Sequence, residues 1–315
     1  MSKPPQRDLQ RPDWVCLAQV WDHGLTPAKP LWVNAVGEII EQPGPLQVHV
    51  HKGMDVGIVV TEGMELQYGD YLFRPRRGDV WLGGMWEPHS WRVVQAGTQT
   101  VQVCFLPDIL EEQREHGLDL LRMFTVPASQ RPRVTTESMR QEALTVASGI
   151  RREERHKRAG WTTVVRAELV RLLVFLLREW KPPGTFSGAV RAADLARIVP
   201  ALALAHDAPD GRVSPRDGAA ACKLSLRTFH AIFGRTMGIS YGKFVERSRL
   251  AAAAQALLDT DLSVHAIADE AGFSDGSHLH RVFRSHYGCT PAEYRRRAMI
   301  ALPTTEGTEW DPEPR

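Results

Sequence analysis

Hydrophobic positions in the last third of the chain recur three and four residues apart, which is the spacing of amphipathic helices. Between residues 263 and 287 the pattern predicts two short helices with a tight turn at Gly272, because glycine readily adopts a left-handed backbone. Ser263 can cap the first helix, and Ser274 or Asp275 can cap the second. The apolar face of the second predicted helix consists of Leu279, Val282 and Phe283. Its other face is polar and basic.

The same pattern occurs a second time about fifty residues earlier. The positions of Leu279, Phe283 and Gly288 are matched there by Phe229, Phe233 and Gly238. A repeat at a fixed offset indicates a duplicated structural unit. The earlier copy predicts a helix from Ser214-Pro215 to Cys222, a turn at residues 223–224 and a second helix capped by Ser225.

A predicted long helix over residues 241–258 joins the two units. At ~1.5 Å per residue it spans about 27 Å, close to the ~34 Å that separates successive major-groove faces of B-DNA. Two helices around a tight turn, the second with a polar outer face, are typical of a helix-turn-helix that inserts a recognition helix into the major groove. The sequence therefore predicts two recognition helices on one side of double-stranded DNA.

The first hundred residues show a hydrophobic period nearer two, interrupted by Gly, Pro and Asp. Short apolar stretches lie at residues 32–33, 46–50, 57–60, 71–73, 80–82 and 101–106. Many short strands with Gly and Pro turns predict a β-sandwich or barrel. The pattern then becomes helical, with helices expected over 109–124, 136–158 and 161–180. A break at Pro182-Pro183-Gly184 predicts a linker over 181–188, followed by a helix over 189–206.

Composition and charge agree with a two-domain globular chain. Of its 315 residues, 43% are hydrophobic and 24% charged, which leaves room for two hydrophobic cores. The net charge is only +2, but residues 181–300 carry sixteen Lys and Arg against eleven Asp and Glu, whereas residues 1–110 carry nine against twelve. The basic excess thus falls on the predicted helix-turn-helix units, as phosphate neutralisation requires.

Cysteine usage and hydropathy indicate a cytoplasmic protein. The four cysteines (Cys16, Cys104, Cys222 and Cys289) are scattered without CxxC spacing, which favours reduced, mostly buried thiols. The first residues have no apolar segment typical of a signal peptide. The sequence also has no run of 18 or more apolar residues, which is the length that a membrane-spanning helix needs. Residues 1–12 and 301–315 are rich in Pro and charge and are expected to be disordered tails.

Residues 200–297 resemble the AraC/XylS-type transcription regulators, whose DNA-binding domain consists of two helix-turn-helix units joined by a long helix. In the second unit the matching residues are Ala268, Gly272-Phe273-Ser274, Arg281-Val282-Phe283, Gly288, Thr290-Pro291 and Tyr294-Arg295. In the first unit and the joining helix they are Leu224-Ser225, Phe233, Gly238, Arg249-Leu250, Ala254 and Leu257-Leu258. The chain departs from the family in the first helix of the first unit, which has few branched apolar residues. We therefore expect that unit to be packed more loosely.

Residues 49–89 resemble the cupin-like N-terminal domain common in AraC-type regulators. The matching points are His49-x-His51, Gly63, Pro75-x-x-Gly78-Asp79 and Glu87-Pro88-His89. The two resemblances together imply an α+β multidomain protein. A cupin-like β-barrel with flanking helices would span 13–180, including dimerisation helices near its end, and an all-α DNA-binding domain would span 189–300. They imply a homodimer that binds DNA and a small-molecule effector, without a cofactor.

The residues expected to contact DNA lie on the outward face of each second helix. Arg227 is the preferred guanine reader, because a guanidinium can bond the O6 and N7 atoms of guanine together. The other candidates for base contacts are His230, Ser277, His278 and Arg281. Contacts to phosphates, which position the protein without reading sequence, are expected from Ser225, Arg235, Lys243, Arg284 and Arg295.

Three histidines in the predicted barrel admit two interpretations. His49 and His51 point to the same side of a strand, so both can face the interior. With Asp55 and His89 they could form a nitrogen and oxygen site suited to Zn, Fe, Ni or Mn. Regulators with such domains commonly keep the His-x-His pattern without a metal, so structural or effector-lining histidines are the preferred interpretation. The effector pocket would then consist of His49, His51, Trp86, Glu87 and His89.

Three classes of function follow from these features. The preferred one is a ligand-responsive DNA-binding regulator, and not an enzyme. In the second, the N-terminal domain only dimerises or binds a protein partner. The third is a cupin metalloenzyme fused to a DNA-binding module. The sequence contains no Walker A loop, GxSxG elbow or HExxH motif, so the common signatures of other enzyme classes are missing.

Overall fold

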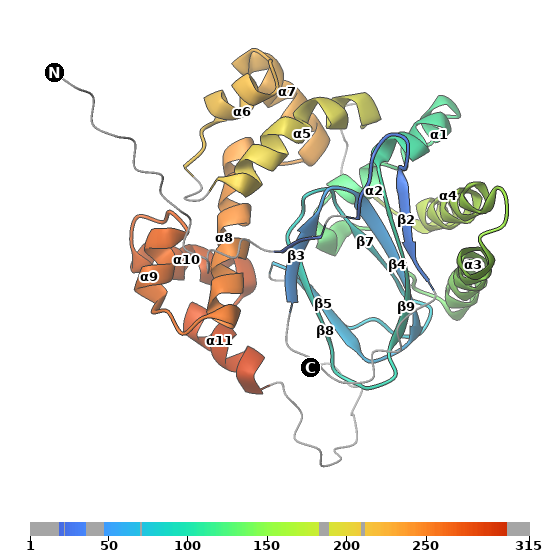
Figure 1. Ribbon diagram of the computed structural model, residues 1–315, viewed down its shortest axis with the longest axis horizontal. Coiled ribbons are helices and arrows are strands. Elements are labelled where there is room, and N and C mark those ends of the chain that lie inside the picture. The colour runs from blue at the N-terminus through green and yellow to red at the C-terminus, as the bar shows by residue number, and fades with distance from the viewer. Residues whose placement is uncertain are drawn as a thin grey trace.

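A computed structural model describes residues 19–21, 23–35, 47–69, 71–182, 189–208 and 212–300. The two predicted tails, Cys16 and most of the predicted linker lie outside the described residues. A β-rich N-terminal part and a C-terminal group of helices lie side by side, with the two helices α3 (Glu137–His156) and α4 (Trp161–Glu179) on the far side of the strands (Figure 1). This α+β architecture confirms the predicted fold class.

The N-terminal part is built from two facing β-sheets. In the first sheet the strands are ordered β1 (Gln19–Trp21), β3 (Gln47–His51), β8 (His89–Val93), β5 (Met64–Tyr68) and β6 (Tyr71–Phe73). In the second they are ordered β2 (Leu31–Asn34), β9 (Gln99–Phe105), β4 (Met54–Thr61) and β7 (Val80–Gly83). Strands β1 and β3 pair in parallel, and all other described pairs are antiparallel. Apolar side chains from both sheets, such as Val59, Leu66 and Trp81, are buried between them.

The sequence pattern did not reveal strands β1, β5 and β8. In β5 and β8 some buried positions are polar, so hydrophobicity does not alternate cleanly. His89 and Ser90 are both buried in β8, and Glu65 is buried in β5, where it accepts hydrogen bonds from Arg74 and Arg92 at 2.6 Å each. Buried polar residues with partners therefore concealed these strands.

The helices that follow the sheets pack against the second sheet. They are η1 (Pro107–Leu110), α1 (Glu111–Glu115), α2 (Arg122–Thr125), η2 (Ala128–Gln130), α3 (Glu137–His156) and α4 (Trp161–Glu179). The predicted single helix over 109–124 is wrong, because Gly117 with a φ of 80° interrupts it. The predicted helices over 136–158 and 161–180 are confirmed, and Thr136 caps α3 by accepting a hydrogen bond from the Met139 amide at 3.2 Å.

The C-terminal helices follow the predicted pattern closely. They are α5 (Ala192–Asp207), α6 (Pro215–Ala221), α7 (Leu226–Met237), α8 (Tyr241–Asp259), α9 (Val264–Glu270), α10 (Gly276–Tyr287) and α11 (Pro291–Ile300). Gly272 turns with a φ of 70°, and Lys223 takes the equivalent left-handed position in the first unit with a φ of 54°. No described helix is both long enough and apolar enough to cross a membrane.

The first helix-turn-helix unit is not loosely packed, contrary to our expectation. Its leading helix α6 is poor in branched residues because aromatic rings occupy that space. A Cβ atom at Gly218 would lie only 2.8 Å from the Tyr241 ring and 2.9 Å from the Phe229 ring. These two rings and Phe233 are fully buried and meet at centroid distances of 5.2–5.4 Å. Small residues on α6 therefore permit a dense aromatic core.

The two parts of the chain contact each other directly. The buried amide Gln255 on α8 accepts a hydrogen bond from the Val48 backbone of β3 at 3.2 Å. Glu111 of α1 accepts one from the Ala192 backbone at the start of α5 at 2.9 Å. The Trp86 ring, in the loop before β8, lies 5.4 Å from the His206 ring of α5. The joining helix α8 is thus seated against the barrel as well as between the two units.

Candidate functional site

Two exposed helices, α7 and α10, are the candidate nucleic-acid interface. Ser225 caps α7 by accepting a hydrogen bond from the Thr228 amide at 3.2 Å, and Asp275 caps α10 through the His278 amide at 2.7 Å. Each helix buries its apolar face: Phe229, Ile232 and Phe233 in α7, and Leu279, Phe283 and Tyr287 in α10. The polar faces are solvent-exposed and include Arg227, His230, Ser277, Arg281 and Arg284.

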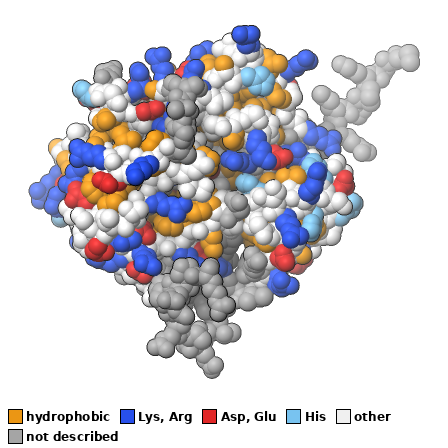
Figure 2. Space-filling view, turned by 180° about the vertical axis from the view of Figure 1, so that it is seen from behind, with side chains coloured by type: hydrophobic (Ala, Val, Ile, Leu, Met, Phe, Trp, Pro, Cys, Tyr) orange, Lys and Arg blue, Asp and Glu red, His pale blue; other side chains and the backbone are white. Residues whose placement is uncertain are grey.

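The joining helix α8 separates these two faces. Its 19 residues correspond to a length of about 28 Å at ~1.5 Å per residue. Figure 2 shows Lys, Arg and His side chains spread over the helical part of the molecule, on the right in that view. Two polar helix faces set apart by about one turn of DNA, within a basic domain, are suited to adjacent turns of one major groove.

A second candidate site lies between the two sheets of the barrel. His49 and His51 of β3 and His89 of β8 are all at most 3% exposed, and the ring centroids of His49 and His89 are 4.0 Å apart. Asp55 of β4 faces them from the opposite sheet, with its Oδ1 3.3 Å from the Nε2 of His51. Its Oδ2 accepts a hydrogen bond from the Trp81 indole at 2.9 Å. The predicted inward pair His49 and His51 is therefore confirmed in its orientation.

The electrostatics of this cluster distinguish its histidines. Burial lowers the pKa of His51, but the adjacent Asp55 carboxylate raises it by more, so this pKa lies well above the ordinary value. Nδ1 of His51 donates to the Gly53 carbonyl at 2.8 Å, so Nε2 is the nitrogen that faces the Asp55 carboxylate. Burial, together with the neighbouring imidazoles, lowers the pKa of His49 and His89. These shifts favour the charged form of His51 beside Asp55 and the neutral forms of His49 and His89.

These histidines also have the arrangement of metal ligands. One ligand atom from each of His49, His51 and His89 lies within 4.8 Å of the others. His51 and His89 each donate Nδ1–H to a backbone carbonyl, which leaves Nε2 as the ligand atom, as outer carbonyls do in metal sites. His51 must release the proton it shares with Asp55 before its Nε2 can bind a cation. The set can therefore hold a divalent transition metal only in competition with protons.

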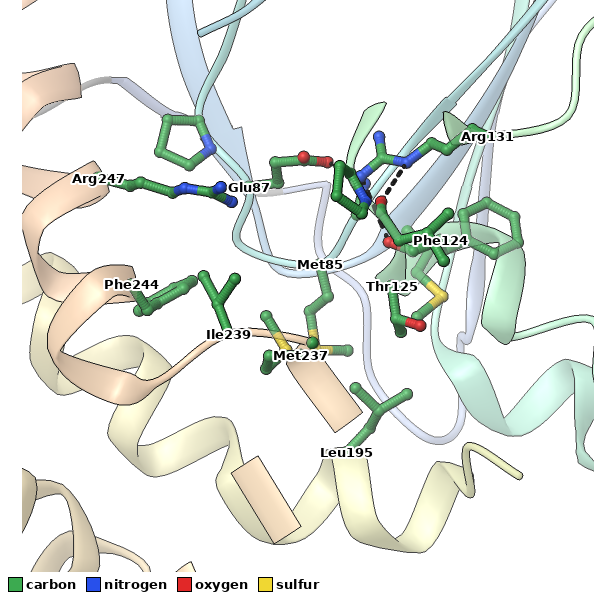
Figure 3. Close-up of a pocket in the computed structure, with 16 residues that line it drawn as sticks. Met85, Glu87, Phe124, Thr125, Arg131, Leu195, Met237, Ile239, Phe244 and Arg247 are labelled. Carbon is green, nitrogen blue, oxygen red and sulfur yellow. Dashed lines mark hydrogen bonds and ion pairs between the residues drawn. The ribbon is translucent and has the colours of Figure 1, made fainter. Parts of the chain in front are cut away.

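A pocket opens where the barrel meets the helical part. Its volume is about 60 Å³, and it is partly open to solvent. Figure 3 shows Met85, Glu87 and Phe124 on the barrel side and Leu195, Met237, Ile239, Phe244 and Arg247 on the helical side. Arg131 forms an ion pair with Glu87 at 2.5 Å and donates to the Leu82 carbonyl at 2.7 Å. The pocket is mainly apolar, with three charged groups at its rim.

Comparisons with known proteins agree on the C-terminal part of the chain. A family described as "Helix-turn-helix domain" matches residues 219–297. The transcriptional activator NphR of a Rhodococcus species is 39% identical over 106 residues, which is 34% of this chain and 31% of that protein. The regulator ExsA of Pseudomonas aeruginosa is 38% identical over 73 residues, 23% of this chain and 26% of that protein. The chain thus spans about a third or less of the length of these two relatives.

Two solved structures are also similar to this chain. An AraC-type regulator from Chromobacterium violaceum is 28% identical, covers 34% of this chain and 96% of its own, and has a TM-score of 0.33. The fatty-acid-bound ToxT of Vibrio cholerae is 12% identical, covers 89% of this chain and 98% of its own, and has a TM-score of 0.42. The C-terminal helices of this chain are thus similar to the helix-turn-helix domains of transcription regulators. Residues 192–300 are called the AraC-type domain below, after the resemblance of residues 200–297.

Within the AraC-type domain, several predicted DNA contacts lie where the prediction requires them. Arg227, His230, Ser277, Arg281 and Arg284 are exposed on the outer faces of α7 and α10. His278 differs, because its Nδ1 is 3.1 Å from the Ser274 hydroxyl and its ring packs edge-on against Phe273. His280 is a further exposed residue of α10 that the sequence pattern did not single out; it lies one turn before Arg284, so helical spacing alone places it on the same face.

Two predicted phosphate contacts have partners inside the AraC-type domain instead. Arg235 forms an ion pair at 2.6 Å with Asp194 of α5, a carboxylate that is 8% exposed. Arg295 of α11 donates to backbone carbonyls at the end of α8. Lys243 forms an ion pair with Glu246, one turn further along α8, and remains half-exposed. We therefore omit Arg235 and Arg295 from the proposed DNA interface, and we retain Ser225, Lys243 and Arg284.

The predicted effector residues divide between the two candidate sites of the barrel. His49, His51 and His89 lie in the interior cluster, whereas Glu87 lines the pocket beside the AraC-type domain. Trp86 lines neither: it is 4% exposed, has a φ of 55° and packs against His206. Its indole Nε1 is buried and has no hydrogen-bond acceptor among the described residues. The chain reversal at Trp86 turns its neighbours Met85 and Glu87 toward the pocket.

Proposed function

We propose that this protein is a sequence-specific DNA-binding transcription regulator whose N-terminal domain responds to a small molecule. The observation that carries the proposal is the pair of exposed, individually capped helices α7 and α10, joined by the single helix α8. The relatives NphR and ExsA, which match this part of the chain, are named a transcriptional activator and a transcriptional regulator. Activation is the mode that the first of these names supports.

In the proposed complex each recognition helix enters the major groove of double-stranded DNA. Arg227 on α7 has an exposed guanidinium that can bond guanine O6 and N7, and Arg281 occupies the equivalent face of α10. Arg284 and Lys243 approach the phosphates, which adds affinity that depends on salt but not on sequence. Because α7 and α10 differ in their exposed residues, the two halves of the site should differ in sequence.

The N-terminal domain would supply regulation and self-association. Buried polar groups in the barrel and a pocket at its border give a small molecule two possible positions. Helix α4 leaves Val164 40% exposed on its outer side, which supports the predicted homodimer through this helix. Without a small ligand, the same domain would act only in dimerisation or in binding a protein partner, as in the second class of function above.

Selection from random double-stranded DNA with the purified full chain tests the proposal. We expect enrichment of a two-part, asymmetric site whose halves are about one helical turn apart. Arg227→Ala should cost about 1–3 kcal/mol on the selected site and relax base preference in one half only, because one bidentate contact is lost. Arg281→Ala should act on the other half. The absence of any enriched sequence, or equal losses on selected and random DNA, would contradict sequence reading by these helices.

A further inference from the structure

We infer that Arg249 of α8 is a positioning residue. It fixes the recognition helix α10 relative to α8 and thereby sets the number of base pairs between the two halves of the DNA site. This inference rests on the proposed DNA-binding function. Helix α8 runs unbroken over Tyr241–Asp259 between the two units (Figure 1). It can hold α7 and α10 at a defined separation only if each unit is anchored to it.

The first unit is anchored at the beginning of α8. Tyr241, the first residue of α8, is fully buried, and its hydroxyl donates to the Ala201 carbonyl of α5 at 3.0 Å. Its ring meets the rings of Phe229 and Phe233 in α7 at centroid distances of 5.2 Å each. These contacts join α8 to the recognition helix itself, so α7 and the first turn of α8 form one packed unit.

The second unit is anchored through its turn, by Arg249. The Nε of Arg249 donates to the Ala271 carbonyl at 2.8 Å, and its Nη2 donates to the Gly272 carbonyl. The guanidinium also lies over the Phe273 ring, with Cζ 4.2 Å from the ring centroid. Carbonyls at a helix end lack partners within the helix, and hydrogen bonds from a charged donor are the strong ones. One side chain of α8 therefore holds three consecutive residues of the turn between α9 and α10.

This turn determines where α10 begins. Phe273 is 3% exposed, and its ring packs edge-on against His278 in the first turn of α10, with the two centroids 5.5 Å apart. The His278 amide in turn donates to Asp275, the cap of α10. A shift of the turn is therefore transmitted to the end of α10 that carries Ser277, one of the residues proposed to contact bases.

Anchoring of both units has a consequence for the DNA. A turn of ~34–36 Å contains 10–10.5 base pairs, so each base pair adds about 3.4 Å and about 35° of rotation. One inserted base pair thus displaces the second half of the site in both distance and angle. While Arg249 holds α10, the protein cannot follow this displacement and should prefer one spacing. Without Arg249, α10 can reorient on α8, so the preference should relax while each helix still reads the same bases.

Binding to DNA sites of altered spacing tests this role with the full chain. We expect the wild type to bind the selected site at least tenfold more tightly than sites with one base pair inserted or removed between the halves. In Arg249→Met this ratio should fall to threefold or less. Arg249→Lys keeps a charged donor for the two carbonyls and should restore part of the ratio. Repeated selection with Arg249→Met should return the wild-type bases in each half.

Two control variants separate positioning from charge and from stability. Arg247→Met removes the same charge from the same helix, but Arg247 faces the barrel pocket, so this variant should keep the wild-type ratio. Val59→Ala lowers stability by removing apolar volume from the core of the barrel and should also keep it. A wild-type spacing ratio in Arg249→Met, or an equal fall of the ratio in either control, would overturn the assignment.

Amide hydrogen exchange of the DNA-free chain tests the anchor without DNA. In Arg249→Met we expect peptides that cover α10 to exchange at least fivefold faster than in the wild type, whereas those of α7 should not change. If circular dichroism shows Arg249→Met to be unfolded, Arg249→Gln takes its place in both experiments. Wild-type exchange in α10, or equal acceleration in α7 and α10, would refute the anchor. A wild type that selects no two-part DNA site would instead refute the proposed function, and the exchange rates would still decide whether Arg249 holds α10.

Discussion

Arg295 is expected to stabilise the second helix-turn-helix unit rather than to bind DNA, and its replacement by Met should separate these roles. From α11 its Nε donates to the Leu257 carbonyl at 2.9 Å, and its Nη2 donates to the carbonyls of Thr260 and Leu262 at 3.0 and 2.8 Å. These acceptors belong to the last turn of α8 and to the chain leading into α9. Helix ends leave such carbonyls without partners in the helix, so Arg295 caps α8 from a distance.

The magnitude follows from these three contacts. A hydrogen bond from a charged donor contributes about 1.5–3 kcal/mol, but the three contacts share one guanidinium that is half-buried, so their effects do not add. We expect Arg295→Met to lower the free energy of unfolding by about 2–3 kcal/mol. Methionine keeps an unbranched apolar stem of good helix propensity, so the loss reports the guanidinium contacts.

Urea denaturation of the full chain, followed by tryptophan fluorescence, measures this loss. Arg296→Met is the matched control, because Arg296 is the exposed neighbour on the same helix. It should change the unfolding free energy by less than about 0.5 kcal/mol. At temperatures where Arg295→Met remains folded, the salt dependence of its DNA binding should equal that of the wild type. An Arg295→Met protein of wild-type stability whose salt slope falls by about one would refute the capping role.

Three further perturbations have distinct expected outcomes. Arg284→Met should leave stability unchanged and lower the salt slope of DNA binding by about one, as measured by titrations at several salt concentrations, because this exposed side chain is proposed to neutralise one phosphate. Gly57→Ala should destabilise the barrel by about 3 kcal/mol in thermal or urea unfolding, since its Cβ would lie 1.8 Å from the Trp81 ring. In metal-free protein the unfolding free energy should fall as the pH drops below about 6.5. Burial lowers the folded-state pKa of His49 and His89, so only the unfolded chain takes up these two protons. The unfolding free energy should therefore change with a slope of up to about 2.7 kcal/mol per pH unit, and His49→Gln should reduce this slope by half.

The helical part of the fold could be predicted from the sequence because its signals are local. Caps such as Ser225 and Asp275, and left-handed turns such as Gly272, act within a few residues. The repeat presents the same pattern of apolar and Gly positions twice, so each copy supports the prediction made for the other. In the barrel many contacts join distant parts of the chain: the Trp81 indole donates to Asp55, 26 residues away, and the His49 ring meets the His89 ring across two paired strands. Gly83 is part of the contact with Asp55, since a Cβ there would lie 1.7 Å from the Asp55 carboxylate.

The prediction of one helix over residues 109–124 was wrong, and strand β8 was not predicted, for opposite reasons. In residues 109–124 the amphipathic pattern continues past Gly117, so hydrophobicity gives no sign of a helix end. The left-handed backbone of Gly117 nevertheless interrupts the helix. In β8 a real strand carried His89 and Ser90 at buried positions, so its pattern looked polar. Periodicity measures only where apolar side chains fall. It is least informative where a buried polar group has a partner elsewhere in the chain, which is also where binding sites occur.

The arginines of the AraC-type domain illustrate the same limit for function. Arg227, Arg247 and Arg295 all lie on helices and are indistinguishable as cations in the sequence. One faces solvent, one has a buried Nε and no acceptor among the described residues, and one bonds three carbonyls. The role of each arginine depends on the groups that surround its guanidinium. The packing of α11 on α8, and of the barrel on α8, decides which groups these are. The role of each guanidinium therefore becomes apparent only in the folded chain, where its exposure and its partners are fixed.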